Sequence, residues 1–409
     1  MNINQHTRHA LLAAIITIGV LAQFLPTLTS TYTNSDIPAH FANALFTTLD
    51  VPVQYPVDIF HYRFYNTFKI GVLATVAVDA YLPLPPTYLF LLYPIYQTFE
   101  PLTSLSITYF LMALFSGLGA LIIYSWLRHD THNDLTALLG AILYCSMPIG
   151  YLYYAGGGFP QIMGGFFVFL ALYCTRMLSA HLHRPAQFAL LTAIITLSLL
   201  IHLGSAIGLL GVLFLILAHH ASTLFKTHKY HIRTALRNHD ATLTLLLGAS
   251  LLLSISLAYF LYYGSFLDLF LDARTKSTTG AFLRPSWDQI YQLFRGYWIL
   301  PLLILTGWRT LRTHPHLRTY LYAWFLCALI FFIANIDIRY VYLIYAPITM
   351  LGAVTLQQLI THRAYRTYIL LGLFLFVIAA FLYSSTWWTY FAHTGYDEKI
   401  HNVLTAFRP

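Results

Sequence analysis

Charged side chains are scarce in this chain. Only 9% of its 409 residues are Asp, Glu, Lys or Arg, whereas about 25% is usual in soluble domains. Hydrophobic residues make up 58% of the chain, and the mean hydropathy is +0.66. The deficit of charge excludes an ordinary soluble globular domain. Together with repeated apolar runs of roughly 20 residues, it predicts an all-α, polytopic helical membrane protein.

Cysteine is also rare. Cys145, Cys174 and Cys327 are the only three, each falls within an apolar run, and no Cys-x-x-Cys pair occurs. This pattern favours small buried hydrophobic side chains over a thiol redox or metal site. The first apolar run is followed by no Ala-x-Ala-like cleavage site, so we expect a retained helix there.

The apolar runs predict about 10–13 membrane helices, including short or re-entrant ones. The stretch 67–100 is ambiguous, because its two halves are short for a span and are joined by Pro83-Leu84-Pro85-Pro86. A short helical pair, a re-entrant hairpin and interfacial helices all fit it. The stretch 186–218 is too long for one span and is interrupted at residues 202–205, which predicts two short helices. The remaining runs are expected at 10–28, 103–127, 134–153, 161–178, 241–263, 297–308, 319–334, 338–359 and 367–385.

Basic residues predict the orientation of the chain in the membrane. With the N-terminus inside, 13 of the 22 Lys and Arg residues and only three of the 14 acids lie inside. This placement accounts for the net charge of +8, so no nucleic-acid partner is implied. The transmembrane domain then covers residues 1–385, with long outer loops at 29–66 and 264–296 and an outer tail at 386–409. Long mixed-charge outer loops are where a site is expected.

Two acid–imidazole pairs lie in the first outer loop, which we expect to form amphipathic helices. Asp36 suits a helix N-cap, and His40 follows one turn later on the same face. Asp58 and His61 form a second pair. Capping and loop lining are the structural explanations. We favour a functional one for Asp36 and His40, because polar groups close to lipid need a reason. All four are ordinary ligands of a divalent cation, but no spacing here is diagnostic of a metal site.

Further candidates lie elsewhere at the outer side. His202 interrupts an apolar stretch, where a satisfied buried histidine and a cavity-lining one are about equally expected. Arg284 and Arg295 belong to the second outer loop, against the inside-positive bias, which suggests an anionic partner such as phosphate, or snorkelling to lipid headgroups. Arg339, followed by Tyr340, opens a late helix at the outer side.

These features resemble the GT-C superfamily of integral-membrane glycosyltransferases. The resemblance rests on Asp36 after the first helix, amphipathic helices in a long first outer loop, the Pro85-Pro86-Thr87-Tyr88 stretch, and the Arg339-Tyr340 pair. The chain departs from some members in having no Asp-x-Asp or Glu-x-Asp pair, and from others in having no large outer C-terminal domain.

The resemblance implies an inverting transfer of a sugar from a polyprenyl-phosphate carrier to a glycan, lipid or protein acceptor. Asp36 would be the general base, and Arg339, with Arg284 or Arg295, would stabilise the leaving phosphate. His40 would orient Asp36 or contact the phosphate. No cofactor is certain, a divalent cation stays open, and the expected location is the plasma (inner) membrane with the site on its outer face.

Two other functions fit the sequence. A transporter or flippase of a lipid-linked or small polar substrate would use broken helices at 67–100 and 186–218. However, no inverted repeat is visible, and the polar groups gather in outer loops. A non-catalytic subunit of a membrane complex is the third possibility.

The orientation is tested by cysteine labelling in intact cells. In a chain whose native cysteines are replaced, a membrane-impermeant thiol reagent should label Ser277→Cys in the second outer loop and leave Lys229→Cys unlabelled. Labelling of Lys229→Cys in intact cells would contradict the orientation and the outer location of the site.

Overall fold

The computed structural model describes residues 4–28, 91–92, 94–95, 98–146, 159–227, 239–263, 311–333, 345–361 and 366–392. Every regular element in these stretches is helical. The α-helices are α1 (Gln5–Phe24), α6 (Pro101–Thr131), α7 (Asp134–Ser146), α9 (Phe159–Leu178), α10 (Pro185–Leu199), α11 (Leu203–Thr227), α13 (His239–Ala258), α17 (Pro315–Ile333), α18 (Tyr345–Thr361) and α19 (Arg366–Ala392). Short 3₁₀ turns are η1 (Leu25–Leu28), η3 (Ser179–His181) and η5 (Leu311–Thr313), and α13 continues into the π-helical turn η4 (Tyr259–Tyr263).

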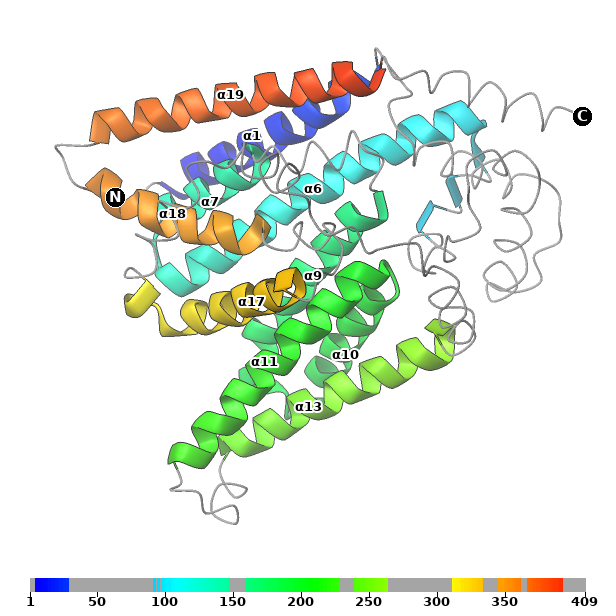
Figure 1. The fold of residues 1–409 in the computed structure, drawn as a ribbon, viewed down its shortest axis with the longest axis vertical. Coiled ribbons are helices and arrows are strands. Elements are labelled where there is room, and N and C mark those ends of the chain that lie inside the picture. The colour runs from blue at the N-terminus through cyan, green and yellow to red at the C-terminus, as the bar shows by residue number, and fades with distance from the viewer. Residues whose placement is uncertain are drawn as a thin grey trace, which may run out of the picture.

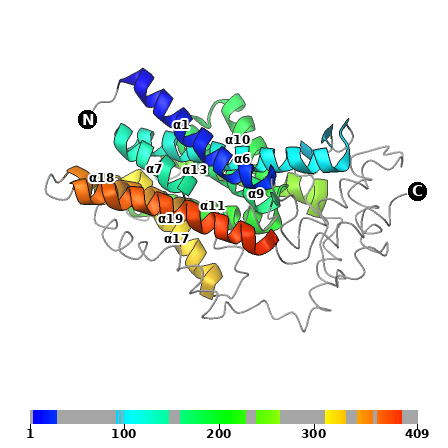
Figure 2. The ribbon, with the colours of Figure 1, turned by 90° about the horizontal axis from the view of Figure 1, so that it is seen from above.

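The helices pack around α6. It contacts α1, α7 and α9, and α7 lies between α1 and α18 when the molecule is seen from above (Figure 2). A second group is formed by α10, which packs on α9 and α13, and by α11, which packs on α17 (Figure 1). The helix α19 rests on α18 at the periphery.

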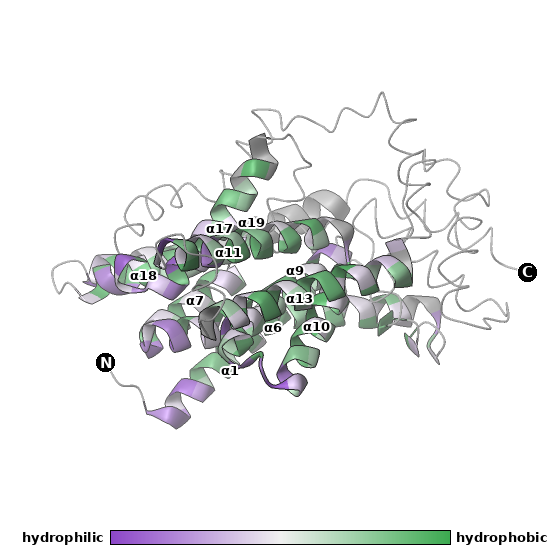
Figure 3. Cartoon of the chain, turned by 90° about the horizontal axis from the view of Figure 1, so that it is seen from below, coloured by the Kyte–Doolittle hydropathy of each residue, from purple (hydrophilic) through white to green (hydrophobic). Residues whose placement is uncertain are grey.

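Length and hydropathy qualify five of these helices as membrane spans. They are Gln5–Leu28, Thr103–Thr131, Phe159–His181, Gly204–Thr227 and Ala241–Leu261. Apolar residues dominate the middle of the helices, and hydrophilic residues gather at their ends (Figure 3). The expected all-α membrane fold is thereby confirmed, and the chain is an integral membrane protein.

The helix bounds follow the apolar runs closely, with three corrections, at the ends of α6, α11 and α19. We expected a loop at residues 128–132, but α6 continues to Thr131 and ends at His132, whose φ of 51° is the left-handed C-cap conformation. Asn133 then caps α7, because its side chain accepts from the backbone N–H groups of Leu135 and Thr136. The connection is therefore only two residues long.

The second correction concerns the end of α11. A loop was expected from His219, yet α11 runs on to Thr227. Thr223 and Thr227 return their hydroxyls to the carbonyls one turn earlier, so these polar residues are satisfied within the helix. The expected break at 202–205 is confirmed, since α10 ends at Leu199 and α11 begins at Leu203. The helix α19 extends to Ala392, past the expected span end at 385.

A glycine allows α6 and α7 to approach closely. A Cβ atom at Gly119 would lie 2.6 Å from the hydroxyl oxygen of Tyr144 and 2.9 Å from its Cζ. The Tyr144 ring has no room to retreat, because its centroid lies 4.5 Å from that of Tyr345 and 5.8 Å from that of Phe169. Tyr345 also donates its hydroxyl to the Tyr144 carbonyl, which joins α18 to α7.

This contact predicts a site-specific loss of stability. Gly119→Val should lower the free energy of unfolding by about 1–3 kcal/mol, the usual effect of overpacking a filled core. Gly372→Val in α19 is the matched control, because a Cβ there would meet nothing within 4 Å. Thermal unfolding of the two purified variants in detergent measures the difference, and equal melting temperatures would contradict the packing described here.

Candidate functional site

The structure describes one residue of the site that the sequence predicts, His202. The other residues of that predicted site lie outside the described part of the chain: Asp36, His40, Asp58, His61, Arg284, Arg295, Arg339 and Tyr340. We predict that Asp36, His40 and Arg339 converge with His202 on one outer-side cavity. The described helices nevertheless show which end of the bundle each of these stretches joins.

One end of the bundle, which we call the basic end, is held together by ion pairs. Asp134, at the start of α7, accepts from the Nη1 of Arg8 at 3.1 Å and from the Nε of Arg128 at 3.0 Å. The Arg8 side chain is only 8% exposed and that of Asp134 15%, so water screens this pair little. The contact joins the N-terminus of α1 to the α6–α7 connection.

Asp130 forms the second ion-paired centre of the basic end. Its carboxylate is 2% exposed and lies 3.0 Å from the Nη2 of Arg176 in α9 and 3.0 Å from the Nδ1 of His129. Trp126 donates its indole N–H to the other carboxylate oxygen at 3.0 Å. A buried carboxylate is tolerated only when it is paired and hydrogen-bonded in this way.

The charge bias of the sequence places these groups on the inner side, but it does not predict their pairing. The signal available was weak: Asp130 and Asp134 are two of the three acids on the predicted inner side. The partners Arg8 and Arg176 are 126 and 46 residues away, so only the folded structure brings them together. Both carboxylates are paired with arginine side chains, so these two ion-paired centres have a structural role.

The opposite end, which we call the His202 end, is joined by aromatic contacts. Phe24 of α1 meets Phe110 of α6 at a centroid distance of 5.4 Å, and Tyr109 of α6 meets Phe159 of α9 at 4.9 Å. Cys327 of α17 lies against the Gly208 carbonyl near the start of α11.

The stretches that carry the proposed site join helices at this His202 end. The stretch between η1 and α6 includes Asp36, and the stretch between α17 and α18 includes Arg339. The stretch that includes Arg284 leaves α13 at η4, whose Tyr263 contacts the end of α10. Connectivity thus attaches the stretches with Asp36 and Arg339 to the same end as His202. The stretch with Arg284 begins at this end and continues into η5 at the basic end.

His202 itself caps α11. Its Nδ1 accepts the backbone N–H of Ser205 at 3.2 Å and lies 3.1 Å from the Ser205 hydroxyl. The ring folds over Gly204, where a Cβ would lie 2.8 Å from Cε1, and α9 packs closely through Gly164, where a Cβ would lie 2.5 Å from the Ser205 Oγ. Since Nδ1 accepts, the neutral ring carries its proton on Nε2.

The end of α10 beside it is closed by Tyr263. Its hydroxyl donates to the Leu199 carbonyl at 2.6 Å, which satisfies one of the last carbonyls of α10. The Nδ1 of His202 is likewise satisfied by Ser205 at the start of α11, which gives this side chain a structural role at the helix break.

Among the described residues, no group of three or more His, Cys, Asp or Glu side chains lies close enough to share a metal ion. The sequence candidates for a divalent cation, Asp36, His40, Asp58 and His61, lie outside these residues.

Comparison with known proteins gives matches among solved structures. No family model matches this chain, and no curated protein matches it. The Archaeoglobus fulgidus oligosaccharyltransferase, in complex with Zn and sulfate, superposes with a TM-score of 0.59 and 16% identity over 93% of this chain and 53% of its own. ArnT from Cupriavidus metallidurans, bound to undecaprenyl phosphate, superposes with a TM-score of 0.53 and 14% sequence identity. The match covers 96% of this chain and 77% of the ArnT chain. The chain spans about half the length of the oligosaccharyltransferase, and the likeness is one of fold.

The ion pairs of the basic end predict unequal effects of two substitutions. Asp134→Ala should destabilise the protein by about 3–5 kcal/mol, because it leaves the buried Arg8 guanidinium without its counter-charge. Arg128→Ala is the control: its side chain is 46% exposed, so losing its bond to the same carboxylate should change stability by about 0–1 kcal/mol. Denaturant or thermal unfolding in detergent compares them, and similar losses for both would contradict the burial argument.

Proposed function

We propose that this chain, whose transmembrane fold is that of the GT-C superfamily, is a membrane glycosyltransferase that uses a polyprenyl-phosphate sugar donor. The observation that carries the proposal is the fold likeness, which extends over 93% and 96% of the chain in the two comparisons. The second of these neighbours was solved with undecaprenyl phosphate bound, which supports a lipid-phosphate carrier for this chain. A glycan, a lipid or a protein is the acceptor class.

The proposed reaction is a single displacement at the anomeric carbon. Asp36 takes the proton of the acceptor hydroxyl as the oxygen attacks, and the bond between the anomeric carbon and the phosphate oxygen breaks. The phosphate leaves with the bonding electrons, so its negative charge grows in the transition state. Arg339 offsets that charge with a planar fork of donors, assisted by Arg284 or Arg295. One displacement inverts the anomeric configuration.

The described helices support this arrangement through the end of the bundle at which the stretches with the proposed site residues begin or end. The stretches with Asp36 and Arg339 join the bundle at the His202 end, away from the ion pairs of the basic end, and the stretch with Arg284 leaves η4 at the His202 end. His202 is held at the start of α11 through its Nδ1, and we place it in the proposed substrate-binding set. His40, Asp58, His61 and Tyr340 complete the proposed substrate-binding set. The outer face of the plasma membrane is the proposed location.

A transporter or flippase is the second candidate. The break between α10 and α11 favours it, because substrate sites in transporters often form at discontinuous helices. The two functions differ in product: a glycosyltransferase makes a new glycosidic bond, whereas a transporter only moves its substrate.

Substitution of Asp36 tests the proposed base. Asp36→Asn keeps helix-capping ability but cannot accept a proton, so sugar transfer should fall about 10²–10⁴-fold while the melting temperature stays unchanged. Asp50→Asn, another acid of the first outer loop, is the matched control and should retain the wild-type rate. Purified protein is incubated with a polyprenyl-phosphate sugar and a panel of glycan, lipid and peptide acceptors, and products are identified by mass spectrometry. Transfer at the wild-type rate by Asp36→Asn would show that Asp36 is only a cap, with Asp58 the next candidate.

A second test concerns the leaving phosphate. Arg339→Lys should retain more transfer activity than Arg339→Ala, because an ammonium still offsets part of the developing charge but lacks the two-donor fork. The same product assay measures both variants. Equal activity of Arg339→Ala and the wild type would remove Arg339 from the mechanism.

A further inference from the structure

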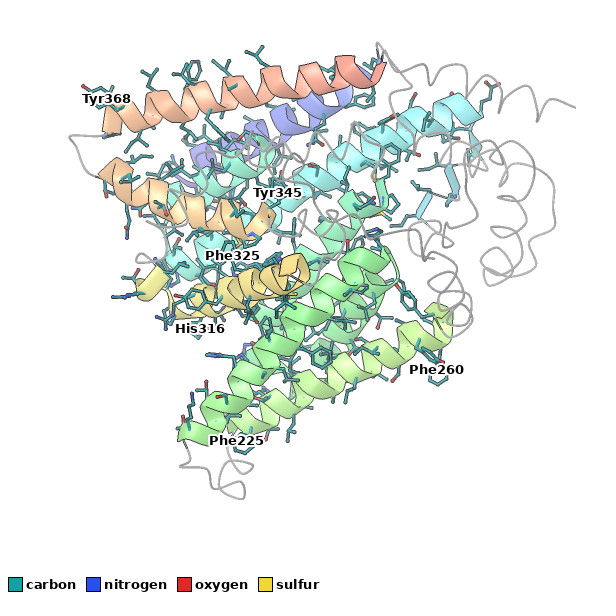
Figure 4. All side chains as sticks on the ribbon, viewed as in Figure 1. Phe225, Phe260, His316, Phe325, Tyr345 and Tyr368 are labelled. Atoms are coloured by element: carbon teal, nitrogen blue, oxygen red, sulfur yellow. The ribbon has the colours of Figure 1, made fainter. Side chains whose placement is uncertain are left out.

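Exposed cations surround the basic end of the bundle. We call Arg184, Lys226, Arg312 and Arg366 the basic ring; they lie at the α9–α10 turn, the end of α11, in η5 and at the start of α19. All four side chains are exposed, and none has a carboxylate partner among the described residues. In Figure 4 the labelled neighbours Phe225, His316 and Tyr368 lie along the same side of the molecule.

The acids of this end do not neutralise the ring. Asp130 and Asp134 are turned inward and are already paired with Arg8, Arg128 and Arg176. In the described part of the chain, the one further acid at this end is Asp240, in the first turn of α13. The ring therefore keeps a surplus of positive charge directed away from the bundle.

Hydrogen-bond donors and aromatic rings accompany these cations. Every histidine in the described stretches except His202 belongs to the basic end, and most are exposed, as His219 and His220 of α11 are. Tyr368, at the start of α19, is 75% exposed, and Phe225 is 39% exposed beside Lys226. Exposed aromatic side chains next to Lys and Arg at the ends of membrane helices are typical of the headgroup layer of a bilayer.

We propose that the basic ring binds the headgroups of anionic phospholipids in the leaflet at the basic end. Each such headgroup carries a phosphate with a net negative charge, which matches a surface of guanidinium, ammonium and imidazole donors at headgroup depth. The apolar helix surfaces below the ring hold the acyl chains. The ring lies at the end of the bundle opposite His202, where the stretches with Asp36 and Arg339 join, so this binding is separate from the proposed base.

A transition-metal ion is a poorer fit to the same surface. The rings of His129 and His132 lie 6.5 Å apart, and Asp130 holds the Nδ1 of His129, an arrangement that resembles a two-histidine site. Arg128 and Arg176 are bonded to the neighbouring carboxylates, and their charge repels a cation while it attracts a phosphate.

The test compares two lipids on the full chain purified in detergent. Phosphatidylglycerol should raise the melting temperature more than phosphatidylcholine of the same acyl chains, and native mass spectrometry should show more retained phosphatidylglycerol. The difference should largely vanish in 1 M salt, where the Debye length is about 3 Å. The wild-type protein alone supplies this result, so the test does not depend on any variant folding.

Matched triple substitutions locate the binding. Arg184→Gln, Arg312→Gln and Arg366→Gln together should abolish most of the preference for phosphatidylglycerol. The control triple, Arg274→Gln, Lys276→Gln and Lys399→Gln, removes the same charge from stretches assigned to the opposite side and should keep the preference. Equal stabilisation of the wild type by both lipids, or an equal loss of preference in the two triples, would overturn the proposal.

Discussion

The pairing of two inward-facing carboxylates with arginines from three helices is the interaction on which the described bundle depends. Asp134 ties the first helix to the α6–α7 connection through Arg8, and Asp130 ties α6 to α9 through Arg176. Buried charges are costly unless each finds a partner, so these contacts admit few alternative registers. The same pairing has an electrostatic consequence, because it removes the acids from the surface and leaves the exposed cations of that end unopposed.

The opposite end is built by different means. Aromatic contacts hold α1, α6 and α9 together there, and the break between α10 and α11 is stabilised by two side chains, with Tyr263 closing one helix and His202 opening the next. A helix break in a membrane protein leaves backbone groups unsatisfied unless side chains replace the missing bonds. The polar residues at this break thus have a structural reason, and the chemistry of the proposed site is expected from the stretches that join the bundle beside them.

Much of the fold could be predicted from the sequence, because apolar length and charge bias are strong local signals in membrane proteins. The break near His202 was predicted because a single span cannot hold so many apolar residues. The continuation of α6 through Asp130 was missed, because a run of polar residues looks like a loop until its distant partners are known. Likewise, α11 passes His219 because Thr223 and Thr227 satisfy their hydroxyls within the helix. For the site, short sequence motifs predicted Asp36 and Arg339. The described helices show that the stretches with these two residues join the same end of the bundle.

A structure of the protein with a polyprenyl-phosphate sugar bound tests the central claim most directly. The account predicts the donor phosphate at the His202 end, with Asp36 facing the anomeric carbon and Arg339 contacting the phosphate. A donor phosphate at the basic end would contradict it. So would a separation of Asp36 and Arg339 beyond roughly 15 Å, well past the Debye length of about 8 Å at physiological salt.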